Sequence, residues 1–158
     1  MNAMIICVGK LKERYWREAA AEYGKRLSRY GKLETVELPD LPEPLKPSPA
    51  EEQKIRAAEG AAILKKIRPD DYVIALMIEG KAMDSVELSR FLQSCYDKGK
   101  HVVFVIGGSL GLDPEVVKRA DAQLSFSPLT FPHQMARIML LEQIYRGCKI
   151  AAGERYHK

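Results

Sequence analysis

The sequence predicts a single α/β domain built on a mostly parallel sheet. Continuous apolar runs, such as residues 72–78 and 101–106, alternate along the chain with segments whose apolar residues recur at helical spacing. Strands that are apolar on both faces are typical of parallel sheets covered by helices on both sides. No repeat and no second block of composition divides the 158 residues, so we expect one domain over residues 1–158.

The first elements are a strand, a helix and a second strand. Residues 3–8 form a short apolar run, and a helix is expected from about residue 14 to residue 30. One face of that helix is apolar, with Trp16, Ala19, Ala20, Tyr23, Leu27 and Tyr30. The opposite face carries Arg14, Arg17, Lys25 and Arg29, and is either a solvated surface or a row of phosphate contacts. Residues 33–38 alternate apolar and polar side chains, which predicts a half-buried strand.

Five prolines between residues 39 and 49 exclude a helix interior or a central strand there. We expect the Pro39–Pro49 segment to be an extended surface loop. A plain linker is favoured over a ligand for a proline-recognition domain. A helix then follows from about residue 50 to residue 67, and the buried strand 72–78 comes next.

Capping signals mark two helix starts in the second half of the chain. Asp84 and Glu87 have the spacing of a capping box and predict a helix that ends near residue 97. After the strand 101–106, Asp113 and Pro114 predict another helix. A short strand is expected at 123–126, and Pro132 opens the last helix.

The last helix is apolar around most of its circumference. Its apolar residues are Met135, Ile138, Met139, Leu140, Leu141, Ile144 and Tyr145. Such a helix is buried on more than one side, either deep in the domain or at a subunit interface. We favour the interface, because one sheet covers only one side of a helix. His133, just inside the helix start, is expected to be packed and hydrogen-bonded rather than catalytic.

Composition excludes several classes of protein. No apolar run approaches the roughly 20 residues that span a bilayer, and the apolar N-terminal segment is too short for a signal sequence. A cytoplasmic protein without membrane contact is therefore expected. The three cysteines lack a C-x-x-C arrangement and are expected to be reduced, structural thiols. The three histidines lie far apart, so no metal site is predicted.

Charge is distributed unevenly along the chain. The net charge is +4, but residues 10–32 carry +5 and residues 137–158 carry +3, which leaves −4 on the remainder. Basic ends around a mildly acidic middle are expected if the ends meet a polyanion. A contribution to solubility alone is the alternative.

The strongest functional signal is the glycine-rich turn after the strand 101–106. Gly107, Gly108 and Gly111 allow positive φ and close approach of a ligand to the backbone, although a tight turn alone also requires glycine. The turn is not a Walker A loop, because Leu112 and Asp113 follow it, and it matches the dinucleotide fingerprint poorly. Ligands bind at the carboxyl ends of strands in open α/β sheets. We expect the turn 79–81 and the loop 125–131 to complete a pocket of three loops there.

Several motifs in order resemble one family. They are Val8-Gly9-Lys10-Leu11-Lys12, Val105-Ile106-Gly107-Gly108-Ser109 with Gly111-Leu112, Leu124-Ser125-Phe126-Ser127, Leu129-Thr130-Phe131-Pro132-His133-Gln134, Glu142-Gln143-Ile144-Tyr145-Arg146 and Tyr156-His157-Lys158. They extend over essentially the whole chain. The sequence resembles the large-subunit (23S) ribosomal RNA pseudouridine-N3 methyltransferases of the SPOUT superfamily.

The resemblance implies an α/β fold with a C-terminal trefoil knot, an exception to the usual absence of knots. It also implies a homodimer, S-adenosylmethionine as cofactor, and a pseudouridine in a stem-loop of 23S rRNA as substrate, within an assembled ribosome. The implied cofactor-binding residues are Leu76, Gly107, Gly108, Phe126, Ser127, Pro128, Leu129, Thr130 and Phe131.

Methyl transfer from a sulfonium needs neither a metal nor a protein nucleophile, but the acceptor N3 must lose a proton. The candidate catalytic residues are Arg146, for orientation or charge, and Tyr156 and His157. The tail residues Tyr156, His157 and Lys158 are expected to contact RNA; without the resemblance, a disordered tail would be preferred. Further RNA contacts are expected from Arg14, Arg17, Lys25 and Arg29.

The sequence departs from the family at two points. Met77 stands where relatives tend to carry an acidic residue, and Glu79 is the candidate substitute. Gly147-Cys148 stand where relatives tend to have an aromatic side chain. Two other classes of function remain open: a dinucleotide-dependent oxidoreductase that uses the turn 107–111, and a ribosome-associated protein without catalysis.

Overall fold

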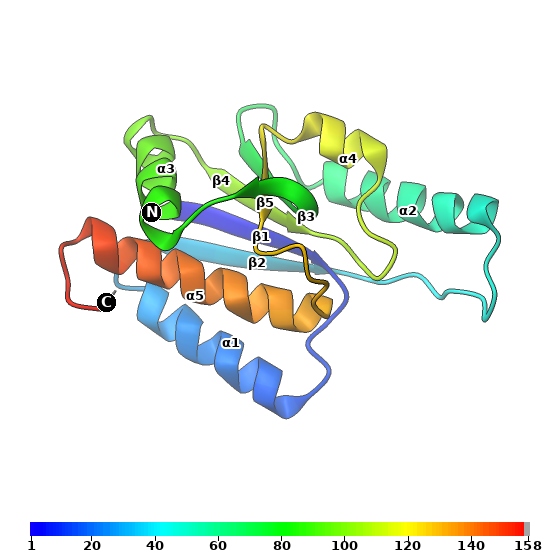
Figure 1. Cartoon of the computed structure of the whole chain (residues 1–158), viewed down its shortest axis with the longest axis horizontal. Coiled ribbons are helices and arrows are strands. Elements are labelled where there is room, and N and C mark those ends of the chain that lie inside the picture. The colour runs from blue at the N-terminus through cyan, green and yellow to red at the C-terminus, as the bar shows by residue number, and fades with distance from the viewer. Residues whose placement is uncertain (157–158) are drawn as a thin grey trace.

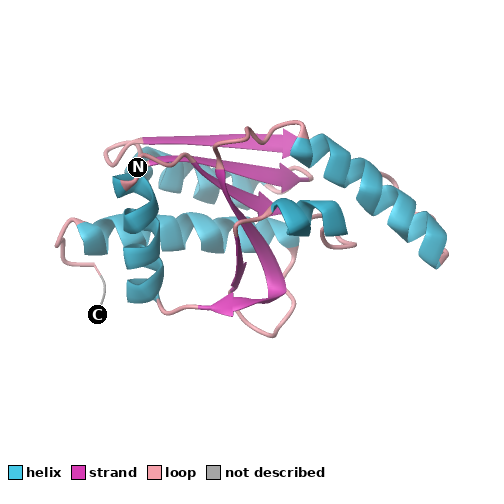
Figure 2. Cartoon of the chain, turned by 90° about the horizontal axis from the view of Figure 1, so that it is seen from above, coloured by secondary structure: helices cyan, strands magenta, loops and turns pink. Residues whose placement is uncertain are grey.

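Five strands form one wholly parallel sheet in the order β2-β1-β4-β3-β5 (Figures 1 and 2). The computed structural model describes residues 1–156. The strands are β1 (Asn2–Val8), β2 (Lys32–Leu38), β3 (Tyr72–Ala82), β4 (Val102–Ile106) and β5 (Ala122–Ser125). The expected parallel α/β fold is confirmed. The C-terminal trefoil knot stays a prediction from the resemblance.

Five helices cover the two faces of the sheet (Figure 1). They are α1 (Arg14–Leu27), α2 (Pro49–Leu64), α3 (Ser85–Asp97), α4 (Pro114–Arg119) and α5 (His133–Ala151). Helices α1, α3 and α5 lie on one face, and α2 and α4 lie on the other. Among residues 1–156, no helix is long and apolar enough to cross a membrane.

Alternate residues of the strands build two cores, one on each face of the sheet. Ile5 and Phe104 join the core beneath α1, α3 and α5, whereas Ile6 and Val105 join the core beneath α2 and α4. Every residue of β4 is buried, because this strand is central and covered on both sides. The edge strand β2 buries only Leu38 fully.

The predicted capping signals are confirmed. Asp84 accepts from the Glu87 backbone N–H at 2.7 Å, and Glu87 accepts from the Asp84 N–H at 2.9 Å. Asp113 accepts from the Glu115 N–H at 3.0 Å. Helix α2 carries a further capping box, between Ser48 and Glu51, and so begins earlier than expected.

Helix α5 packs against α1, α3 and the sheet within one chain. Leu140, Leu141, Ile144 and Tyr145 are its buried apolar residues. The intramolecular contacts therefore account for much of the apolar circumference that favoured a subunit interface, and the interface stays a prediction.

Candidate active site

A cavity of about 810 Å³ opens at the carboxyl ends of β4 and β5, beside the middle of β3. Residues 76–79, 106–112, 124–127 and 129–133 line it, together with Val117 and Ala136. Its volume lies in the range of small-molecule sites, about 300–1,000 Å³. The position is the one expected for a ligand site in an open parallel sheet. The glycine turn and the loop 125–131 meet there as predicted, but the predicted turn 79–81 is part of β3, and only Glu79 of it lines the cavity.

All but one of the predicted cofactor residues line this cavity. They are Leu76, Gly107, Gly108, Phe126, Ser127, Leu129, Thr130 and Phe131. Pro128 is exposed and belongs to the same loop, but it is not part of the lining. Met77 and Glu79 also face the cavity, so the carboxylate suggested as a substitute lies at its wall.

Close packing in and around the turn requires glycine at these positions, whether or not a ligand binds. Gly111 has a φ of +80° and donates its N–H to the Gly108 carbonyl at 3.1 Å. A Cβ at Gly107 would lie 3.0 Å from the carbonyl carbon of Gly111, and one at Gly108 would lie 3.2 Å from Val8. Of these three glycines, only Gly111 uses the positive φ that the sequence suggested.

The Pro39–Pro49 segment has no strand, and only Pro49, the first residue of α2, is helical. The expected extended surface loop is confirmed. Two contacts attach it to the neighbourhood of the glycine turn: the Leu41 N–H donates to Glu59 at 3.2 Å, and the Ser109 hydroxyl donates to Glu43. Burial raises the pKa of Glu59, and the nearby carboxylates of Asp40 and Glu43 raise it further.

The N-terminal motif and the start of α5 pack against each other beside the cavity. The Lys12 N–H donates to the Gln134 side chain at 2.7 Å. Gly9 has a φ of +93°, and a Cβ there would lie 2.9 Å from His133 Nε2. His133 is packed as expected, and its buried Nε2 has no hydrogen-bond partner among residues 1–156.

Arg146, a predicted catalytic residue, lies in a polar cluster further along α5. Its guanidinium donates to Glu142 through Nη2 at 2.6 Å and through Nε at 3.1 Å. The Tyr156 hydroxyl donates to the same carboxylate at 3.1 Å, and the guanidinium carbon lies 4.6 Å from the centre of the Tyr156 ring. Glu142 was not among the predicted site residues, although a Glu and an Arg four residues apart on a helix are a known pairing signal.

Comparison with known proteins identifies the family. A family model described as a predicted SPOUT methyltransferase matches residues 1–157. The chain is 54% identical to a protein of Alkaliphilus oremlandii and to one of Bifidobacterium adolescentis, and 51% identical to one of Clostridium perfringens. Each is named ribosomal RNA large subunit methyltransferase H, and each alignment covers all of both chains.

The chain belongs to the SPOUT methyltransferase family. Within this SPOUT methyltransferase, the cavity and the Arg146 cluster lie at different places along α5. Ala136 lines the cavity in the first turn, and Arg146 is ten residues further, which corresponds to about 15 Å along the helix axis. One chain therefore does not bring Arg146 to the cavity.

The residues predicted to contact phosphates are exposed, but most already have protein partners. Three of them lie on α1, whereas Arg29 follows it, because the helix ends at Leu27 and not near residue 30 as expected. Arg14 pairs with Glu18 at 2.6 Å, and the Arg17 guanidinium donates to the carbonyls of Leu11 and Lys12. Arg29 lies 3.7 Å from Glu154. Lys25 has no ion pair among residues 1–156. Since exposed pairs contribute little, at most about 1 kcal/mol, they leave these side chains available for RNA.

The two remaining tail residues of the prediction, His157 and Lys158, lie outside the described residues. Within residues 1–156, no group of three or more His, Cys, Asp or Glu side chains is placed to hold a metal ion.

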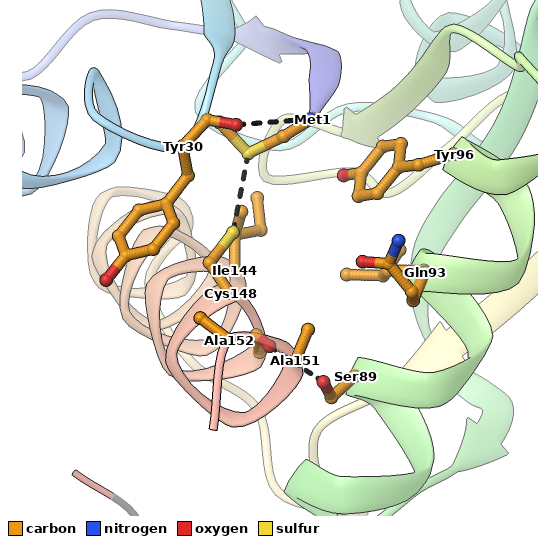
Figure 3. A pocket seen from close by; sticks show the side chains of 11 residues that line it. Met1, Tyr30, Ser89, Gln93, Tyr96, Ile144, Cys148, Ala151 and Ala152 are labelled. Atoms are coloured by element: carbon orange, nitrogen blue, oxygen red, sulfur yellow. Dashed lines mark hydrogen bonds between the residues drawn. The ribbon is translucent and has the colours of Figure 1, made fainter. Parts of the chain in front are cut away.

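A second, smaller cavity of about 370 Å³ lies between α3, α5 and the N-terminus (Figure 3). Met1, Tyr96 and Cys148 face it, and the Met1 amino group donates to the Tyr30 carbonyl at 3.1 Å. Gly147 also lines this cavity, so the Gly147-Cys148 departure from the family lies here, whereas Met77 lines the larger cavity. None of the predicted cofactor residues lines the smaller cavity.

Proposed function

We propose that the chain methylates N3 of a pseudouridine in a 23S rRNA stem-loop, with S-adenosylmethionine as donor, on the assembled ribosome in the cytoplasm. One observation carries the proposal: the cavity beside β3 and at the carboxyl ends of β4 and β5 is lined by all but one of the residues that the resemblance implied for the cofactor. The names of the full-length relatives support the substrate class.

The cavity suits this cofactor in size and chemistry. Leu76, Phe126 and Phe131 offer apolar surface to an adenosine, and the backbone of the glycine turn offers polar groups beside it. Glu79 supplies a carboxylate at the wall, which complements a cofactor that carries positive charge.

The bound cofactor supplies an electrophilic methyl group, so the protein has to orient the acceptor and manage its proton. The bond from N3 to the methyl carbon would form as the sulfur–methyl bond of the cofactor breaks, and the N3–H proton would pass to solvent. The positive charge of Arg146 would stabilise the negative charge that deprotonation leaves on the base. Burial, followed by the neighbouring Glu142 carboxylate, raises the pKa of Tyr156, so its phenol stays protonated and acts as a hydrogen-bond donor rather than a base.

In a homodimer, Arg146 of one protomer can lie close to the cavity of the other, although the two are far apart within one chain. We propose that each cavity is completed by Arg146 and the tail of the other protomer. Three exposed apolar side chains at or near the cavity mouth, Ile78, Leu129 and Met135, support an interface there.

The test uses radiolabelled S-adenosylmethionine, the purified chain, and ribosomes from cells that lack this modification, followed by nucleoside analysis. Label in N3-methylpseudouridine is expected, together with cofactor binding by calorimetry. Cofactor binding without label would move the substrate elsewhere. Absence of both would favour the ribosome-binding protein, and nicotinamide-cofactor binding would favour the oxidoreductase.

A further inference from the structure

The Glu142 carboxylate is the centre of a hydrogen-bond network that joins three parts of the molecule. Arg146 and Tyr156 donate to its Oε1, and the Gln143 side chain donates to its Oε2 at 2.8 Å. Gln143 in turn accepts from the Ser85 hydroxyl of α3 at 2.8 Å. A single acidic side chain on α5 therefore connects the tail, the candidate catalytic arginine and the start of α3.

The network leaves one edge of the Arg146 guanidinium available. Glu142 takes the Nε and Nη2 edge, and Nη1 has no hydrogen-bond partner among residues 1–156. Because the guanidinium is planar and rigid, fixing one edge also fixes the direction of the other. The Tyr156 ring lies against the same guanidinium, and Tyr145 meets the Tyr156 ring edge-on at 5.1 Å.

This pair differs from the exposed pairs of the same spacing. The side chains of Glu142 and Arg146 are 18% and 25% exposed, whereas those of Glu22 and Arg26 on α1 are 53% and 42% exposed. Partial burial lowers screening by water and strengthens the hydrogen bonds. The hydrogen bond that Arg146 donates to Glu142 raises the pKa of Arg146 and keeps it charged.

We propose that Glu142 is a positioning residue for methyl transfer, which holds Arg146 and Tyr156 in the orientation that the target nucleotide meets. The inference rests on the proposed roles of Arg146 and Tyr156. A direct contact between Glu142 and the RNA backbone is disfavoured, because a carboxylate repels phosphate. Glu142 is outside the cofactor cavity, so it acts on the acceptor side of the reaction.

The experiment compares Glu142→Gln and Glu142→Ala with the matched control Glu22→Gln, which breaks an exposed pair of the same spacing. Misplacing a catalytic group by about 1 Å costs up to about a hundredfold in rate. We therefore expect kcat on ribosomes to fall about tenfold to a hundredfold for Glu142→Ala, and less for Glu142→Gln, which keeps an acceptor oxygen. Cofactor affinity by calorimetry should match the unmodified protein, and Glu22→Gln should leave kcat unchanged.

A double-mutant cycle separates positioning from a merely structural role. If Glu142 acts through Arg146 and Tyr156, the losses of the double variant Glu142→Gln/Arg146→Ala are less than additive, because the part that acts through Arg146 is already lost in Arg146→Ala. Unchanged kcat in both Glu142 variants, or additive losses in the cycle, overturns the inference. Full activity of Arg146→Ala would instead contradict the proposed role of Arg146, so the two failures are distinguishable.

Discussion

At the scale of single residues, the buried thiol of Cys7 connects packing to pH. Cys7 lies on β1 in the core beneath α5, with 2% of its surface exposed. Burial raises the pKa of this thiol from 9.0 to about 11, and the Arg137 guanidinium opposes the shift only in part. Together with the absence of a disulfide among the described residues, this agrees with the predicted reduced, structural thiol.

The raised pKa of Cys7 predicts a loss of stability in alkali. The folded state keeps the proton longer than the unfolded chain, so the contribution is fully present below pH 9 and is lost as pH rises to about 11. Two pH units correspond to about 2–3 kcal/mol. Urea unfolding of Cys7→Ala across this range should show a weaker decline in the free energy of unfolding than the unmodified protein. Val8→Ala, a buried truncation without a titrating group, should keep the full decline; equal slopes in all three proteins would contradict the assignment.

At the scale of elements, β3 is longer and less regular than its apolar run predicts. The run indicated a strand that ends at residue 78, but β3 continues to Ala82, and its pairing with β5 shifts register between Leu76 and Lys81. Gly80 allows this path, because a Cβ there would lie 2.6 Å from the backbone carbon of Leu124. The irregular stretch, residues 76–79, also forms a wall of the cavity proposed to bind the cofactor.

Gly80→Ala is therefore expected to weaken both the sheet edge and cofactor binding. Overpacking against backbone costs about 1–3 kcal/mol, since the backbone of Leu124 cannot rotate away as a side chain would. Thermal unfolding and calorimetry with S-adenosylmethionine measure the two effects.

Gly24→Ala is the control: nothing lies within 4 Å of its Cβ, and alanine in a helix interior should raise stability by about 0.5–1 kcal/mol. Unchanged stability and affinity of the Gly80→Ala protein would contradict this prediction and show that β5 shifts to accommodate the added methyl group.

How far the sequence predicts an element depends on how local its causes are. The Asp84 capping box and the buried strand β4 follow from residues adjacent in the chain, and both were predicted. The register shift of β3 and the packing of Gly9 on His133 arise from contacts between residues far apart in the sequence. Glu142 was missed for a related reason: its pairing with Arg146 is visible as helical spacing, but its bond to Tyr156 requires the path of the tail.

At the scale of the whole molecule, the arrangement of the sheet explains where function gathers. The strand order places β3, β4 and β5 side by side, so the middle of β3 and the carboxyl ends of β4 and β5 border one cavity. Helix α5 begins at that cavity and runs away from it, packed against α1, to the Arg146 cluster. The basic segments predicted to meet RNA include α1 and the later part of α5, which pack together on one face of the sheet (Figure 1).

This separation predicts complementation between two inactive proteins. Gly107→Val should abolish cofactor binding, because any Cβ there meets the Gly111 backbone at 3.0 Å, whereas Arg146→Ala should bind the cofactor but fail to transfer the methyl group. If each active site combines the cavity of one protomer with Arg146 of the other, a heterodimer holds one intact site. Random reassortment of equal amounts should then restore about a quarter of the unmodified rate.

Each variant reassorted with itself is the control. Restoration in no pairing, although heterodimers form, would place both groups of a site on one chain, and the distance along α5 would have to be bridged by movement of the tail.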